Sequence, residues 1–324
     1  SIIYYLIKKY LLIISMRNYY IRKIKSKRKN NYKHEYKDKN GKTVSKRTLE
    51  PYLKVYIAPA YDNVKINKNT NAKVLAIGYD ERDRPQYIYN SKCVKTRGRN
   101  KFKKLIKFGK NYKKLLSKIE RDYSSHRDTK EKQIAMILKI IIDCNFRIGN
   151  DEYTKDNNGF GVSTLESRHI NIKNGVNIDF IGKKGVQNKC EIEDQKMKKN
   201  LRTKKKKYKK NQRIFTYQKD KETYEIKSTD VNEYLGEYTT KNFRTWSANV
   251  LLIGDLLKDK GNKENIKKSI EFVADKLHHT PSICKKNYID PKLVEYYKKD
   301  PDKFCKFFKG DIDKSFTEFL EKNY

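Results

Sequence analysis

The sequence has few cysteines and no long apolar run. Its five cysteines are odd in number, widely spaced and without a C-x-x-C pair. This pattern favours neither a disulfide framework nor a zinc site, and we expect a reducing compartment. The apolar start, "SIIYYLIKKYLLIIS", is interrupted by Lys8 and Lys9, is too short to cross a bilayer and lacks a small-residue cleavage site. We therefore expect neither a membrane span nor secretion, and we treat residues 1–15 as an upstream extension before an initiating Met16.

Several motifs of nucleotide, metal and serine chemistry are also missing. The chain has no G-x-x-x-x-G-K-[ST] phosphate loop, no H-E-x-x-H, no G-x-S-x-G and no carboxylate cluster suited to paired Mg²⁺ ions. Dependence on ATP or on a metal is therefore disfavoured, and we expect no cofactor.

Acidic residues are scarce relative to basic ones. The 77 Lys and Arg residues stand against 39 Asp and Glu residues, which gives a formal net charge of +38. AT-rich codons, which favour Lys, Asn, Ile and Tyr, explain part of this excess. Because the basic residues run along the whole chain among Tyr and Phe, nucleic acid fits better as a partner than a membrane surface.

The expected fold class is α+β, with two domains. Short runs between residues 52 and 89, "YLKVYIA", "AKVLAIGYD" and "PQYIYN", are typical of small strands and turns. The basic stretch at 95–104 has little apolar periodicity and is predicted to be a linker against a polyanion. We thus expect a β-rich N-terminal domain over 16–95 and a larger, mainly helical domain over 96–324.

Within the larger domain, apolar periodicity predicts a helix whose buried face contains Ile134, Ile137, Leu138, Ile141 and Ile142. Alternating residues and glycine turns over 161–192 predict a small antiparallel sheet. The basic segment 196–213 is interpreted as a solvated loop that could also contact phosphates. Helices are expected from Thr229 to the C-terminus.

Five short motifs occur in one order along this domain, and together they resemble the type IB DNA topoisomerases of the poxvirus and bacterial group. They are "FRIGNDEY" at 146–153, "STLESRHI" at 163–170, "FIGKKGV" at 180–186, "KNFRTW" at 241–246 and "HHTPSICKKNYI" at 278–289. In the N-terminal part, "GYDERDRPQYIYNSKCVKTR" at 78–97 resembles that group's DNA-clamping domain. The resemblance implies the fold of the DNA breaking-rejoining enzymes.

The resemblance also implies the catalytic residues: Tyr288 as the nucleophile, Lys183 as the general acid, and Arg147, Arg244 and His279 as ligands of the attacked phosphate. Tyrosine is a poor nucleophile at neutral pH because its ordinary pKa is about 10, so fixed cations beside it would favour its phenolate character during attack. Lys184 is the alternative acid. His279 stands directly before Thr280-Pro281, as the family has it, which leaves His278 outside the site and Thr280 as a helix cap.

The implied activity is that of a type I DNA topoisomerase, an isomerase that relaxes supercoils through a transient 3′-phosphotyrosyl link. A tyrosine recombinase or integrase shares this chemistry and is the alternative; it usually has His three residues before the second arginine, where this chain has Lys241. A basic DNA-packaging protein would explain the charge but not the ordered motifs.

For the DNA-binding surface, the resemblance implies contacts from Arg84, Tyr87, Tyr89, Arg97 and Tyr153. The expected partner is double-stranded DNA, bound by a monomer. Composition and resemblance suggest a large AT-rich DNA virus such as an entomopoxvirus. Such an enzyme would occupy the virion and the infected-cell cytoplasm; a non-viral one would lie in the cytoplasm with the DNA.

Overall fold

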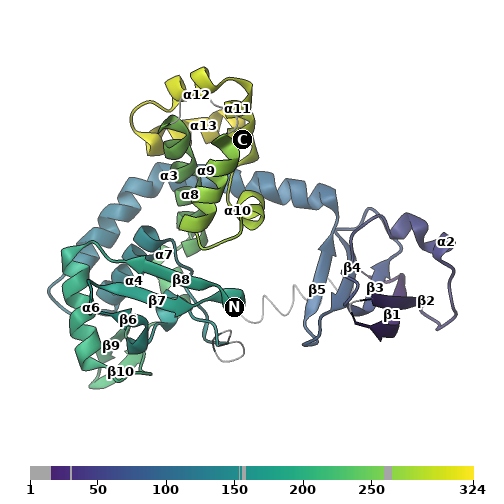
Figure 1. Cartoon of the computed structure of the whole chain (residues 1–324), viewed down its shortest axis with the longest axis horizontal. Helices are drawn as coiled ribbons and strands as arrows, with labels where there is room; N and C mark the ends of the chain where they lie inside the picture. Colours follow the sequence, from purple (N-terminus) through teal and green to yellow (C-terminus); the bar gives the residue numbers. More distant parts are fainter. Residues whose placement is uncertain (1–15, 30, 153, 155–157, 259–264) are drawn as a thin grey trace. The chain divides into compact units, whose positions relative to one another are not determined.

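The boundary between the two parts of the chain lies inside a helix. The computed structural model describes residues 16–29, 31–152, 154, 158–258 and 265–324, and it divides the chain into units of residues 1–101 and 102–324. The helix α3 (Ser91–Ser124) runs through this division (Figure 1). The prediction of a linker at 95–104 is therefore wrong. The apolar repeat that begins with Phe102, Leu105 and Phe108 is buried, and the basic residues before it continue the same helix.

The first unit contains a five-stranded antiparallel sheet in the order β2-β1-β3-β4-β5. Its strands are β1 (Tyr19–Arg28), β2 (Asn31–Lys37), β3 (Asp62–Asn67), β4 (Val74–Tyr79) and β5 (Pro85–Tyr89). The short helices α2 (Lys46–Leu49) and η1 (Glu50–Tyr52) join β2 to β3, and Leu49 packs in one core cluster with Val64, Ile66 and Ala76.

The predicted strand over "YLKVYIA" is wrong. After η1 this stretch has no regular structure, and its carbonyl groups pair with a side chain instead of a neighbouring strand. The buried guanidinium of Arg22 donates to the carbonyl oxygens of Ile57 and Ala58, at 3.3 and 2.6 Å, and to that of Tyr61 at 3.0 Å. A buried cation thus satisfies backbone acceptors that a sheet would otherwise satisfy.

In the second unit, α3 is followed by the helix α4 (Lys130–Cys144), which is capped by Thr129 and by Asn145 in the left-handed conformation. The predicted apolar face is confirmed in the main: Ile134, Ile137, Leu138 and Ile141 are buried, and Ile142 is partly exposed. The predicted sheet also forms, from β6 (Ile170–Asn171), β7 (Asn177–Ile181) and β8 (Gln187–Glu191) in antiparallel order.

The basic segment 196–213 is mostly helical, so its interpretation as a loop is wrong. It forms α6 (Gln195–Lys207), which buries Met197, Leu201 and Lys204 at helical spacing. The Nζ of Lys204 donates to Gln133 Oε1 at 2.8 Å and to the carbonyl of Ile214 at 2.7 Å. Burial lowers the pKa of Lys204 to about 8. Lys204 is thus a structural hydrogen-bond donor. After α6 the chain forms a hairpin of β9 (Thr216–Lys219) and β10 (Glu222–Glu225).

Helices predominate in the described residues after β10, as predicted (Figure 1). They are α7 (Ser228–Leu235), α8 (Thr240–Lys258), α9 (Asn265–Lys276), α10 (Pro281–Asn287), α11 (Pro291–Lys299), α12 (Pro301–Phe307) and α13 (Ile312–Asn323). Thr280, Asp290 and Asp300 cap the helices that begin with proline. Helix α8 packs against α4, α9 and α13, so it lies at the centre of the helical packing and can hold a site between them.

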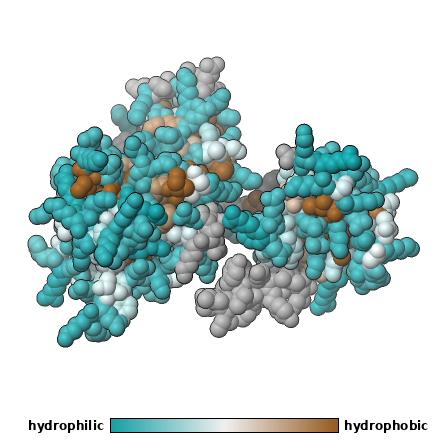
Figure 2. Space-filling model, turned by 60° about the horizontal axis from the view of Figure 1, so that its bottom comes forward, coloured by the Kyte–Doolittle hydropathy of each residue, from teal (hydrophilic) through white to brown (hydrophobic). Residues whose placement is uncertain are grey.

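The described surface in Figure 2 is mainly hydrophilic, as the polar composition leads one to expect. On the face shown in Figure 2, hydrophilic residues cover most of the described surface, and hydrophobic residues form small separate groups. Among the described helices, none has the length and apolarity that crossing a membrane requires.

Candidate active site

Three of the five proposed catalytic residues meet at one hydroxyl group, and a fourth contacts the histidine among them. Tyr288 follows α10 directly and is buried. Arg244 Nη1 donates to its hydroxyl oxygen at 3.0 Å, and His279 Nε2 lies 3.3 Å from the same oxygen. Arg147 Nη2 lies 2.8 Å from His279 Nε2. Residues up to 141 positions apart in the sequence therefore form one cluster of two cations, an imidazole and a phenol.

The side chain of Arg244 is held from three directions. It projects from the first turns of α8 and is 4% exposed. Besides the Tyr288 hydroxyl, its Nε donates to the carbonyl of Asn145 and its Nη2 to the carbonyl of Leu277, each at 2.8 Å. Burial lowers the pKa of Arg244 to about 10, so the guanidinium stays charged at neutral pH. A planar group with several donors fits such a position, which an ammonium could not fill.

Arg147 lies in the segment after α4, and a close backbone contact places it. Its carbonyl accepts from Val162 N at 2.9 Å, and the carbonyl of Ile148 accepts from Ser163 N at 2.7 Å. A Cβ atom on Gly161 would lie 2.7 Å from the Arg147 carbonyl oxygen and 2.3 Å from the backbone nitrogen of Gly149. Gly161, two residues before the "STLESRHI" motif, therefore allows the Arg147 segment to approach.

One donor of Arg147 is unused. Its Nη1 is buried and makes no hydrogen bond to any residue that the structure describes. A buried donor without a partner costs free energy, about 1–3 kcal/mol or more for a charged group. The cluster thus has an unsatisfied cationic N–H group, which an anion could satisfy.

His279 is a neutral imidazole in this cluster. Burial, followed by the charges of Arg147 and Arg244, lowers the pKa of His279 to about 3. A neutral imidazole can still donate one hydrogen bond from the nitrogen that carries its proton. His279 is consequently suited to hydrogen bonding with an anion rather than to carrying a positive charge.

Lys183 lies on another element, outside this hydrogen-bonded set. It is exposed on the turn between β7 and β8, where the structure forms the predicted glycine turn. Lys184 beside it has a positive φ of 65°, so the two lysines project from different backbone conformations. An exposed ammonium on a turn can approach a bound ligand.

The first unit brings together three of the proposed DNA-binding residues. Tyr87 and Tyr89 stack at 6.3 Å between ring centroids, and the Arg97 guanidinium lies 4.0 Å from the Tyr89 ring centroid. Arg84 pairs with Asp80, 2.9 Å away. Tyr153 lies outside the described residues.

A buried amide outside the predicted set of site residues holds the backbone of the tyrosine. Asn249 is fully buried on α8; its Nδ2 donates to the Tyr288 carbonyl at 3.0 Å and its Oδ1 accepts from Asp290 N at 2.8 Å. The available signal was an asparagine on the otherwise apolar face of a helix, five residues after Arg244. Buried amides of this kind require partners, and here two of them are the carbonyl of the tyrosine itself and the amide two residues after it.

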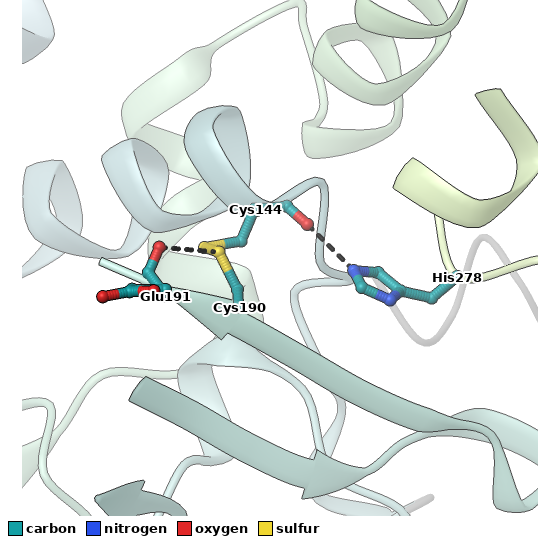
Figure 3. Close-up of a disulfide and its surroundings, with 4 residues drawn as sticks. All are labelled: Cys144, Cys190, Glu191 and His278. Atoms are coloured by element: carbon teal, nitrogen blue, oxygen red, sulfur yellow. Dashed lines mark hydrogen bonds between the residues drawn. A yellow bond between two sulfur atoms is a disulfide. The ribbon is translucent and has the colours of Figure 1, made fainter. Parts of the chain in front are cut away.

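The expectation of no disulfide is wrong. Cys144, the last residue of α4, is bonded to Cys190 near the end of β8, and the His278 ring contacts the Cys144 carbonyl (Figure 3). The two cysteines are 46 residues apart in sequence but have Cα atoms 5.8 Å apart. Spacing along the chain could not indicate this pair because the fold alone brings the two elements together.

Groups of acidic, histidine and cysteine side chains offer no metal site in the described part of the chain, where no three of them are placed to hold an ion.

The chain is similar in sequence to several known proteins. A family model described as "Eukaryotic DNA topoisomerase I, catalytic core" matches residues 90–308. The chain is 29% identical over 311 residues to "DNA topoisomerase 1B" of Acanthamoeba polyphaga mimivirus, covering 88% of this chain and 90% of that protein. It is 26% identical over 258 residues to "DNA topoisomerase 1" of rabbit fibroma virus (strain Kasza), covering 77% and 79%. It is 24% identical over 234 residues to "DNA topoisomerase 1B" of Vaccinia virus (strain Copenhagen), covering 70% and 73%.

Proposed function

Because the chain belongs to the DNA topoisomerase I family, as a type IB enzyme related to those of large viruses, we propose that it relaxes supercoiled duplex DNA by cutting and resealing one strand. The reaction uses neither ATP nor a metal ion. Tyr288 is the nucleophile, Arg147, Arg244 and His279 bind the attacked phosphate, and Lys183 is the general acid. The observation that carries this assignment is the Tyr288 hydroxyl between Arg244 and His279, beside an Arg147 with an unused donor.

In the first step, the Tyr288 hydroxyl oxygen attacks the phosphorus of one phosphodiester and its proton leaves to solvent. The bond from phosphorus to the 5′ oxygen breaks, and Lys183 gives a proton to that oxygen. The products are a 3′-phosphotyrosyl link and a free 5′-hydroxyl end. Resealing is the same step in reverse, so the phosphotyrosyl bond retains the energy that a new phosphodiester needs.

Electrostatic stabilisation comes from the two guanidinium groups. Negative charge grows on the non-bridging oxygens as the tyrosine attacks, and preorganised donors stabilise it by roughly 3–4 kcal/mol each in comparable enzymes. Arg147 Nη1 supplies a donor that is already desolvated. Arg244 is fixed by two backbone carbonyls, so little reorganisation is required when the phosphate binds.

His279 contributes a hydrogen bond and leaves proton transfer to Lys183. With a pKa of about 3, it stays neutral at physiological pH, and its Nε2 lies near both Arg147 and the tyrosine hydroxyl. When a phosphate oxygen occupies the cluster, Arg147 can turn its donors to that oxygen. The imidazole is then free to hold its proton on Nε2 and to donate it to the phosphate.

DNA binding uses both units. The enzyme acts as a monomer, and the net charge of +38 supplies sequence-independent attraction to phosphates. Tyr87, Tyr89 and Arg97 form one contact surface in the first unit, and Arg84 and Tyr153 add further contacts. The cut strand rotates about its intact partner strand while Tyr288 holds the 3′ end.

Relaxation of a supercoiled plasmid in EDTA without ATP tests the function as a whole. The wild-type chain should relax the plasmid and leave a protein–DNA adduct that survives denaturation. Tyr288→Phe should bind DNA with similar affinity and form no adduct, whereas Tyr296→Phe, a matched change of a tyrosine on α11, should behave as the wild type. A denaturation-resistant adduct from the Tyr288→Phe protein would overturn the assignment of the nucleophile.

A further inference from the structure

His278 occupies a backbone position that glycine normally fills. The end of α9 has the paired hydrogen bonds of a Schellman motif, His279 N to the Ala274 carbonyl and His278 N to the Asp275 carbonyl, each at 2.9 Å. In this motif the residue after the cap adopts the left-handed conformation, and His278 has a φ of 55°. A residue with a Cβ atom pays for this conformation and glycine does not. We therefore expect a contact of the His278 side chain to offset this cost.

The side chain makes a specific hydrogen bond to another helix. His278 Nε2 lies 3.1 Å from the carbonyl oxygen of Cys144 (Figure 3). A carbonyl accepts, so Nε2 carries the proton. Cys144 ends α4, and carbonyl groups in the last turn of a helix have no amide partner within that helix. The ring also packs on Phe146, with centroids 5.0 Å apart.

This bond joins the two segments that carry phosphate ligands. Arg147 follows Cys144 by three residues, and His279 directly follows His278. The ends of the same two helices are also bridged by Arg244, which donates to the carbonyls of Asn145 and Leu277. Arg244 and His278 thus form two side-by-side links between α4 and α9, and Arg147 and His279 lie 2.8 Å apart beyond them.

We propose that His278 is a positioning residue for strand cleavage: its hydrogen bond to the Cys144 carbonyl fixes Arg147 and His279 relative to each other. This inference rests on the proposed function of these two residues. His278 acts through its neighbours and does not touch the phosphate. Loss of the bond removes neither the nucleophile nor any phosphate ligand, but it allows the Arg147 segment to shift against His279.

Three variants separate positioning from helix capping. His278→Gly removes the hydrogen bond and also removes the conformational penalty. His278→Asn tolerates the left-handed conformation, but its short amide does not extend to the place of Nε2. His278→Gln keeps an amide nitrogen close to that place and keeps the penalty. If His278 were only a cap, glycine and asparagine would serve at least as well as histidine.

The test measures single-turnover cleavage of a duplex whose 5′ product dissociates, at saturating protein, together with DNA affinity and the unfolding temperature. The Gly and Asn variants should unfold near the wild-type temperature, because relief of the left-handed conformation offsets the lost hydrogen bond and ring contact, and they should bind DNA equally well. Their cleavage rate constants should fall by about 10- to 100-fold, the loss expected when catalytic groups shift by a fraction of an ångström to an ångström. The Gln variant should cleave at close to the wild-type rate.

Two results would overturn the inference: a glycine variant that cleaves at the wild-type rate, or a glutamine variant that is as slow as the glycine variant. An absence of any adduct from the wild-type chain would count instead against the proposed function. The two failures are thus distinguishable in one set of measurements.

Discussion

Arg244 Nη1 donates to the hydroxyl oxygen of Tyr288 at 3.0 Å, while the other nitrogens of the same guanidinium are bonded to the backbone of two other segments. The cation nearest the proposed nucleophile is thus itself fixed by the end of α4 and the end of α9. Arg244 therefore needs both its charge and its fixed geometry, and a substitution that keeps only the charge tests the geometry.

Arg244→Lys should retain the charge and lose most of the activity. The single nitrogen of an ammonium cannot replace the three hydrogen bonds that the planar group makes from three different nitrogens. We expect the rate constant for adduct formation to fall by about 10²- to 10³-fold, as for the loss of one preorganised donor. Arg202→Lys, on the exposed side of α6, is the matched control and should have no effect. If the Arg244→Lys protein formed the adduct with the wild-type rate constant, the geometry of the guanidinium would have no role.

Lys183→Ala should slow cleavage of ordinary DNA by about 10²- to 10⁴-fold, the usual contribution of a general acid. A duplex with sulfur in place of the 5′ bridging oxygen should be cleaved at a nearly normal rate, because a thiolate leaves without proton donation. Lys184→Ala is the matched variant on the same turn and should need no such rescue. If the Lys184 variant is the one rescued by sulfur, the acid is Lys184.

Reduction of the Cys144–Cys190 disulfide should lower the unfolding temperature. A cross-link that closes a loop of this length restricts the unfolded chain, and its loss costs about 2–4 kcal/mol of unfolding free energy. The wild type should therefore melt at a lower temperature in a dithiol reductant, and a Cys144→Ala, Cys190→Ala double variant should not respond to it. Cys305→Ala, which changes a free cysteine, is the control and should respond like the wild type. Equal melting of the wild type with and without reductant would contradict the disulfide.

Acid should destabilise the DNA-free protein partly through His279. Its pKa is lowered from 6.5 to about 3 on folding, so the unfolded chain binds this proton first as the pH falls. The stability that a neutral His279 provides is therefore complete above about pH 6.5 and is lost progressively toward pH 3. His279→Gln should show a shallower loss of unfolding free energy between about pH 6.5 and 4.5 than the wild type. His126→Gln, at an exposed position, is the control; an unchanged slope for His279→Gln would contradict the prediction.

Local patterns in the sequence predicted the helices and the small sheet of the second unit well. The apolar face of α4, the Thr280 cap with Pro281 and the glycine turn at Lys183 all depend on residues within one or two turns of each other. Where apolar and basic residues are mixed, the predictions were wrong. The charge of residues 95–104 and 196–213 predicts a linker and a loop, yet all of the first and most of the second are helical because a few buried positions, such as Phe102 and Leu201, determine the packing.

By itself, the sequence determined the set of candidate residues, since the order and spacing of Arg147, Lys183, Arg244, His279 and Tyr288 were recognisable from their motifs. The tertiary structure alone decided how they are held. Asn249 beside Tyr288, the Cys144–Cys190 bond and the contact of His278 with Cys144 join residues 39 to 134 positions apart. Contacts at such separations leave no periodic signal in the chain, because they depend on how whole helices and strands pack against each other.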